Sequence, residues 1–126
     1  MIKGNVGTVI INEDNGLIAD EKFFVETFAL EDGLKNLKAG TLLKWNTDKT
    51  KLSLLGAHTE EPIAVLYENV DGSTKDSHAP AIIFGRVNVN TLVSAGTSVA
   101  ELAPADKRNI IESLRKVGIY ATEGER

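Results

Sequence analysis

The sequence contains no cysteine, and this absence removes several kinds of site at once. Without thiols the chain can form neither a disulfide nor a cysteine-ligated zinc site, and it has no cysteine nucleophile. Its 126 residues are enough to bury one hydrophobic core without such cross-links. We therefore expect one small domain that is held together by packing.

The charge pattern of a nucleic-acid-binding protein is also missing. The formal net charge is −4, and the basic residues are scattered along the chain. Their densest group, Lys44, Lys49 and Lys51, is diluted by Asp48. Binding to phosphates needs clustered cations, so the sequence predicts no nucleic-acid partner.

Long apolar runs are absent as well. No run approaches the roughly 20 residues of a membrane span, and the first residues do not combine a basic stretch with an apolar one, as a signal peptide does. We therefore expect no membrane partner and a protein that is made in a cytoplasm-like compartment.

Signatures of catalysis and metal binding are equally scarce. The two histidines, His58 and His78, lie in separate polar stretches, and their acidic neighbours lack the spacing of a metal site. No zinc-protease helix motif, nucleophile elbow or phosphate-binding glycine loop is present. Asp71 beside Gly72 leaves a small β-rich nucleotide hydrolase open, although no phosphate-binding motif accompanies it. The sequence predicts no catalytic residue, no cofactor, no metal and no enzyme activity.

What the chain does have is a series of short β-prone segments separated by polar stretches. The predicted strands are Phe23–Leu30, Leu42–Trp45, Leu52–Leu55, Ile63–Tyr67, Ala81–Phe84 and Arg86–Asn90. Residues 31–40 are predicted to form a turn, and residues 68–80 a long loop. In Asn46–Lys51, two side chains can accept backbone hydrogen bonds, so this stretch predicts a hairpin turn and not the rim of an active site. Trp45 beside this turn is either a binding aromatic or a partly buried edge of the core.

Helical periodicity is confined to the C-terminal part of the chain. Apolar residues recur at helical spacing at Ile110, Ile111, Leu114 and Val117. Pro104 suits the first turn and Gly118 suits the C-terminal cap, so a helix is predicted near residues 104–117. Ser98 and Glu101 have the spacing of a capping box, which predicts a short extra turn upstream.

An isolated β-prone segment, Val6–Ile11, precedes the turn signal Glu13–Gly16. A single strand is hardly stable in water, so this segment needs a partner. It either pairs within its own sheet or forms an arm that docks on another chain by strand addition. We therefore divide the chain into an arm, residues 1–22, and a β-rich domain, residues 23–126.

The order of these segments resembles the head decoration proteins of tailed phages, of the lambda type, over roughly residues 23–120. The residues that carry the resemblance are Gly40-Thr41, Ala64-Val65-Leu66, and Gly85 before the alternating strand. The resemblance implies a mainly β fold with a C-terminal helix (α+β), arranged as a small clip-like barrel or sandwich. The sequence departs from the lambda pattern in a more apolar arm and a longer helix.

The resemblance also implies a function. Such a protein is a structural part of the virion that binds the outer capsid surface at three-fold positions as a homotrimer and stabilises the expanded head. Its partners are the major capsid protein and itself, and it is made in the bacterial host cytoplasm. In this chain Thr8, Val9, Ile10 and Ile11 would form the capsid-contacting arm. The alternatives are a small β-barrel ligand-binding module, a nucleotide-type hydrolase, or another part of the virion such as the tail.

Overall fold

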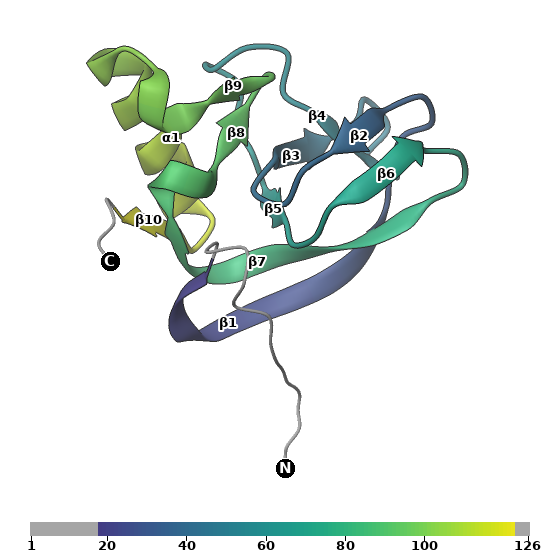
Figure 1. The fold of residues 1–126 in the computed structure, drawn as a ribbon, viewed down its shortest axis with the longest axis horizontal. Helices are drawn as coiled ribbons and strands as arrows, with labels where there is room; N and C mark the ends of the chain where they lie inside the picture. The colour runs from purple at the N-terminus through teal and green to yellow at the C-terminus, as the bar shows by residue number, and fades with distance from the viewer. Residues whose placement is uncertain (1–17, 123–126) are drawn as a thin grey trace.

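The computed structural model describes residues 18–122. The predicted arm residues Thr8, Val9, Ile10 and Ile11 lie outside this range. The described chain is mainly β, with one α-helix close to its C-terminal end, which confirms the predicted fold class (Figure 1).

The main sheet has one continuous path of five strands. In order across the sheet these are β1 (Ile18–Ala29), β7 (His78–Asn88), β5 (Ala64–Leu66), β3 (Leu42–Trp45) and β4 (Leu52–Leu54). All neighbours along this path are antiparallel. A further strand, β10 (Ile119–Thr122), lies parallel to β7. The end strands β1 and β4 are linked only through the single bridge between Leu30 and Leu52, so the sheet is not a closed barrel, and that part of the prediction is wrong.

β1 begins at Ile18, five residues before the predicted domain start at Phe23. Residues 18–22, which the sequence analysis assigned to the arm, are therefore part of the sheet, where Ile18 pairs with Val87.

Two small ribbons complete the β-structure. One pairs β2 (Lys35–Leu37) with β6 (Val70–Ser73), and the other pairs β8 (Val93–Ser94) with β9 (Thr97–Ser98). The first ribbon corrects the prediction of a plain turn and a plain loop. Asp and Gly have low strand propensity, but here the backbone N–H of Gly72 donates to Asn36 Oδ1 at 2.9 Å, a contact that the local sequence does not reveal.

The polar stretch between β3 and β4 is a hairpin turn, as predicted. Trp45 pairs with Leu52 at the base of the turn. Asn46 Oδ1 accepts hydrogen bonds from the backbone N–H groups of Thr50 and Lys51, at 3.1 and 3.2 Å. The polar residues therefore stabilise a turn instead of lining a reaction site.

β7 is one long strand where the sequence predicted two. Its register with β1 shifts between the pairs Phe24–Phe84 and Val25–Ile82, which marks a bulge. Next to the bulge, Ala81 and Ile82 are both buried. The protein has two clusters of buried apolar residues, and these two residues belong to different clusters. The apolar run is therefore buried on both faces of the sheet at this point.

The two core clusters lie on opposite faces of the sheet, since neighbours such as Leu42 and Leu43 point to opposite sides of a strand. The first packs beneath the helix and its preceding turns and contains Leu42, Leu55, Val65, Ile82, Val87, Val89, Leu92, Val99, Ile110, Leu114 and Ile119. The second contains Leu30, Leu37, Leu43, Leu52, Ala64, Leu66, Ala79 and Ala81.

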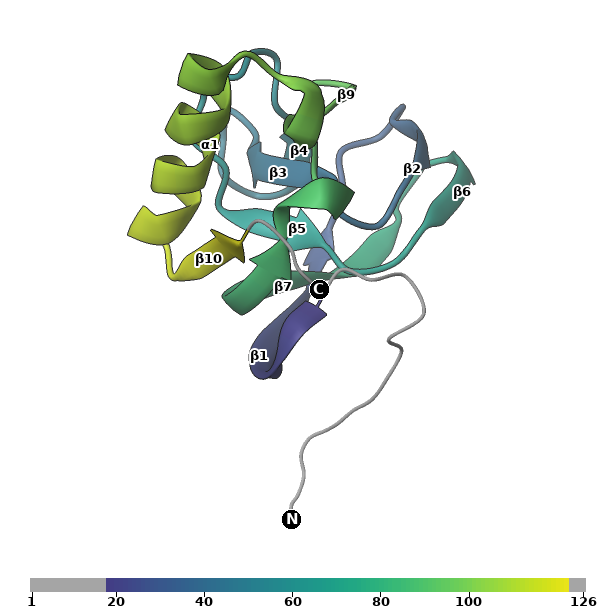
Figure 2. The same ribbon diagram turned by 60° about the vertical axis from the view of Figure 1, so that its left-hand side comes forward.

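The helix α1 (Pro104–Lys116) begins at the predicted proline. Two 3₁₀ turns, η2 (Val89–Thr91) and η3 (Val99–Glu101), lie between β7 and α1. The predicted extra turn is η3, but the Ser98 side chain makes no capping hydrogen bond, so the predicted capping box is wrong. Gly118 follows the helix with a φ of +93°, and β10 starts at the next residue. Figure 2 shows α1 standing beside β10 and the end of β7.

Candidate interaction surface

The two histidines lie apart, and only His58 makes contacts that hold the fold. His58 Nδ1 lies 3.0 Å from Ser94 Oγ, and the Asn109 side-chain amide donates to the backbone carbonyl of His58 at 3.0 Å. These contacts fasten the segment after β4 to β8 and α1. His78 is exposed at the start of β7. Within residues 18–122 no group of three His, Asp or Glu side chains is placed to hold a metal ion.

Asp71, which left a hydrolase open, is exposed on β6. The neighbouring Gly72 has a φ of +75°, and its N–H already donates to Asn36. That amide is therefore committed to the β2–β6 ribbon and is not free to bind a phosphate.

The carboxylate of Glu60 has a structural role. Its Oε1 accepts a hydrogen bond from the backbone N–H of Gly56 at 2.6 Å and lies 3.0 Å from Lys44 Nζ. The Gly56 hydrogen bond first, and Lys44 second, lower the pKa of Glu60 from its ordinary value of 4.5. The carboxylate closes a turn.

Two other carboxylates have the same role. The hydroxyl of Thr50 donates to Asp48 Oδ1 at 2.6 Å, and this bond is the main cause of the lowered pKa of Asp48. The backbone N–H of Asp76 donates to Asp32 Oδ1 at 3.0 Å and likewise lowers the pKa of Asp32. The carboxylates of Glu60 and Asp48 thus stabilise local turns, and that of Asp32 joins the turn after β1 to the β6–β7 connection.

Exposed apolar side chains are the feature of the described surface that a binding partner would bury. Five large apolar side chains are exposed among the described residues, and three of them lie together: Phe24, Phe84 and Tyr120, with exposed fractions of 63%, 43% and 44%. We call these three residues the aromatic patch. The other two exposed apolar residues are Val117 and Trp45.

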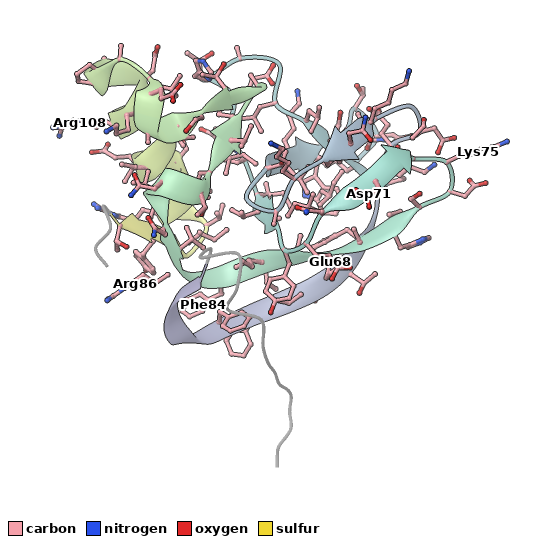
Figure 3. The ribbon with its side chains drawn as sticks, viewed as in Figure 1. Glu68, Asp71, Lys75, Phe84, Arg86 and Arg108 are labelled. Atoms are coloured by element: carbon pink, nitrogen blue, oxygen red, sulfur yellow. The ribbon has the colours of Figure 1, made fainter. Side chains whose placement is uncertain are left out.

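The aromatic patch forms a row across three strands. The ring centroids of Phe24 and Phe84 are 5.6 Å apart, and those of Phe84 and Tyr120 are 6.5 Å apart with an edge-to-face geometry. On the opposite face of the same strands, Val87 and Ile119 are buried in the cluster beneath α1. This end of the sheet is therefore covered by the helix on one face and exposes aromatic rings on the other. Figure 3 shows Phe84 and Arg86 at this end of β7.

Gly118 fixes the position of the central ring. A Cβ at this residue would lie 2.9 Å from Phe84 Cδ1, and its φ of +93° disfavours other residue types. The chain that turns from α1 into β10 thus passes directly against the Phe84 ring and holds it in place.

The composition of this surface resembles that of protein–protein interfaces. The solvent face of an antiparallel sheet is commonly polar, whereas clustered exposed aromatics mark a contact site. Arg86, which pairs with Tyr120 across the β7–β10 ladder, is exposed and has no ion-pair partner within the described residues. Aromatic residues and arginine are both enriched in protein–protein interfaces.

Both ends of the described chain leave beside the aromatic patch. Ile18 pairs with Val87 on one edge of β7, and Ala121 pairs with the same Val87 on the other edge. The first described residue, Ile18, therefore lies at this end of the sheet, on the strand that carries Phe24.

The sequence does not reveal the aromatic patch, because the period of two in a strand places Phe24 on the same face as Phe28 and Leu30. Leu30 is fully buried and Phe28 is partly buried, but Phe24 is exposed. The one local signal in the sequence is Gly85, which follows Phe84 within a strand, where a glycine indicates a bulge or a close approach. Trp45 is 38% exposed and packs edge-to-face on Phe28, as expected for a partly buried edge of the core.

No helix within the described residues has both the length and the apolar character needed to cross a membrane. No protein-family model matches the chain, and no curated protein sequence matches it.

Proposed function

We propose that this protein is a capsid decoration protein, which binds the outer surface of a phage head at three-fold positions and stabilises the expanded shell. The observation that carries the proposal is the aromatic patch, an uncovered apolar face located where the N-terminal segment joins the sheet. The order of strands and glycines, which resembles the lambda-type family, supports the same function.

Such a protein acts by binding alone and catalyses no reaction. A protein that binds the assembled shell but not its disrupted form shifts the equilibrium towards the shell. Three copies that act together multiply weak contacts through their effective concentration. The partners in this proposal are the major capsid protein and two further copies of the chain, and the protein resides on the virion surface after synthesis in the host cytoplasm.

Within the proposal the aromatic patch and the arm residues Thr8–Ile11 face the capsid together. The aromatic rings supply buried apolar area at low entropic cost, and Arg86 supplies a charge at their rim. The arm supplies a strand for pairing with the capsid protein. This role needs no catalytic residue, and Glu60 and His58 serve to fasten surface segments.

The test is co-sedimentation with capsids of the phage that encodes the protein, before and after expansion. We expect saturable binding to expanded capsids, and affinity that falls roughly tenfold or more for Phe84→Ser and for deletion of residues 1–17. Lys75→Ser, an exposed change at the start of the β6–β7 connection, is the control and should bind like the unmodified chain. Absence of binding to either capsid form contradicts the proposal and favours a ligand-binding module instead.

A further inference from the structure

The segment between β4 and β5 is attached to the rest of the fold by polar contacts. None of residues 56–61 is buried. His58 Nδ1 lies 3.0 Å from Ser94 Oγ in β8, and the Asn109 side chain in α1 donates to the backbone carbonyl of His58 at 3.0 Å. His58 is therefore the residue at which this segment is fastened to both β8 and α1.

Ser94 determines which nitrogen of the His58 ring carries the hydrogen. Ser94 is fully buried, and a buried hydroxyl needs an acceptor for its hydrogen. Within the described residues, the His58 ring is the only hydrogen-bond partner of the Ser94 hydroxyl. Ser94 Oγ therefore donates to Nδ1, and the neutral ring carries its hydrogen on Nε2.

Protonation of the His58 ring is incompatible with this hydrogen bond. In the charged ring both nitrogens carry a hydrogen, so Nδ1 can no longer accept one. The Ser94 hydroxyl would then keep a buried hydrogen without an acceptor, which is unfavourable. Histidine is the side chain whose charge changes between about pH 8 and pH 5, so mild acid opposes the contact.

The charged side chains of the segment itself are engaged with other groups. Glu60 Oε1 lies 3.0 Å from Lys44 Nζ in β3, and Glu61 Oε2 lies 4.0 Å from Lys116 Nζ at the end of α1. Among the described residues, neither carboxylate forms an ion pair with His58. They therefore do not hold a charged ring in this position.

The elements packed against His58 supply no compensating charge either. Residues 93–98, which form β8, β9 and the turn between them, contain no charged residue. On α1, Asp106 and Glu112 lie about one turn before and after Asn109. Neither forms an ion pair with His58 in the described part of the chain. A charged ring would thus lose its hydroxyl partner and gain no carboxylate.

We propose that protonation of His58 releases residues 56–61 from β8 and α1, so that this attachment is a pH-sensitive switch. The released form binds the additional proton, so lowering the pH favours it. The segment leaves as an intact turn, because Glu60 still accepts the hydrogen bond from Gly56, which lowers the pKa of Glu60 from 4.5. The inference goes beyond the proposed function and does not depend on binding to a capsid.

The test is nuclear magnetic resonance of the free, full-length chain between about pH 7.5 and pH 5.5. At the upper pH, the chemical shifts of the His58 ring nitrogens should identify a neutral ring with its hydrogen on Nε2. As the ring gains its proton, the signals of the Asn109 side-chain amide should shift to those of an amide exposed to water, since this amide loses the carbonyl of His58.

Two variants separate His58 from the general effect of acid. His58→Asn has an amide oxygen that can accept from Ser94 at every pH, so the Asn109 signals should stay in place and urea unfolding should show a smaller loss of stability on acidification. His78→Asn is the matched control, because His78 is exposed at the start of β7, and it should respond to pH like the unmodified chain.

The titration of the unmodified chain needs no variant, so the inference remains testable where a substitution disturbs the segment. A neutral His58 ring with its hydrogen on Nδ1 would overturn it, as would an Asn109 amide that does not respond to pH. A pH response that survives His58→Asn, or that His78→Asn removes, would also overturn it.

Discussion

At the scale of single residues, Gly40 occupies a position that a side chain does not fit. Its φ is +98°, and an added Cβ would overlap the carbonyl oxygen of Thr91. Its own N–H donates to the carbonyl of Leu66 at 2.8 Å, and its carbonyl accepts from the N–H of Val93 at 2.9 Å. The backbone cannot move away without breaking these bonds, so this glycine joins three separate segments.

We predict that Gly40→Ala lowers the free energy of unfolding by about 2–4 kcal/mol, because overpacking and an unfavourable φ add together. Gly33→Ala is the matched control, since Gly33 has a φ of +92° but no atom within 4 Å of its added Cβ. It should lose only about 1 kcal/mol from backbone strain. Urea unfolding of both variants measures the difference, and equal losses would show that the close approach to Thr91 is unimportant.

Glu60 gives a pH dependence at the same scale. Its pKa in the folded protein lies below the ordinary 4.5, chiefly because the Gly56 N–H donates to it. The folded state therefore gains stability from this group above pH 4.5, and that gain is lost as the pH falls through 4.5 towards the lower folded pKa. We predict that Glu60→Gln reduces the loss of stability on acidification.

The measurement is the urea midpoint at a series of pH values from neutral to acid for both proteins. The two curves should converge as the pH drops, because the protonated carboxyl and the amide are then both neutral. A constant gap between the curves across the whole range would show that the ionised form of Glu60 contributes nothing specific.

At the scale of elements, the buried and the exposed side of α1 should contribute unequally to the stability of the fold. Leu114 is fully buried, whereas Ile111 is partly buried and lines an open groove on the exposed side of the helix. We predict that Leu114→Ala costs about 3 kcal/mol of unfolding free energy and Ile111→Ala about 1 kcal/mol, since only the former leaves a cavity in the core. Urea unfolding checks both values, and a larger loss for Ile111→Ala would mean that the groove side is part of the core.

The elements that could be predicted from the sequence are those with local causes. The hairpin turn follows from Asn46 and its neighbours, and the helix follows from its periodicity together with Pro104 and Gly118. β6 could not be predicted, because the contact that holds Gly72 comes from Asn36, distant in sequence. β10 could not be predicted either, because its four residues are too few to show a clear period and the strand is defined by its pairing with β7.

The candidate site was harder to predict than the fold for a similar reason. A period of two places Phe24, Phe28 and Leu30 on one side, yet the three differ from exposed to fully buried. The bulge in the β1–β7 pairing and the curl of the sheet decide which of them reaches solvent. These are properties of strand pairing, so the pattern within one segment does not contain them.

At the scale of the whole molecule, the proposed function rests on one contact region, the aromatic patch on the outer face of β1, β7 and β10. The exposed side of α1 shares no residue with this patch. Changes on that side of the helix should therefore leave capsid binding by the patch intact, and the effects of such distant changes should add.

The central claim is that the aromatic patch is the face that docks on the capsid. Hydroxyl-radical footprinting of the free and capsid-bound protein tests it directly, because exposed aromatic side chains are oxidised and buried ones are protected. We predict that oxidation of Phe24, Phe84 and Tyr120 falls severalfold on expanded capsids, relative to the free protein at the same concentration. Unchanged oxidation of these three side chains in capsid-bound protein would contradict the claim.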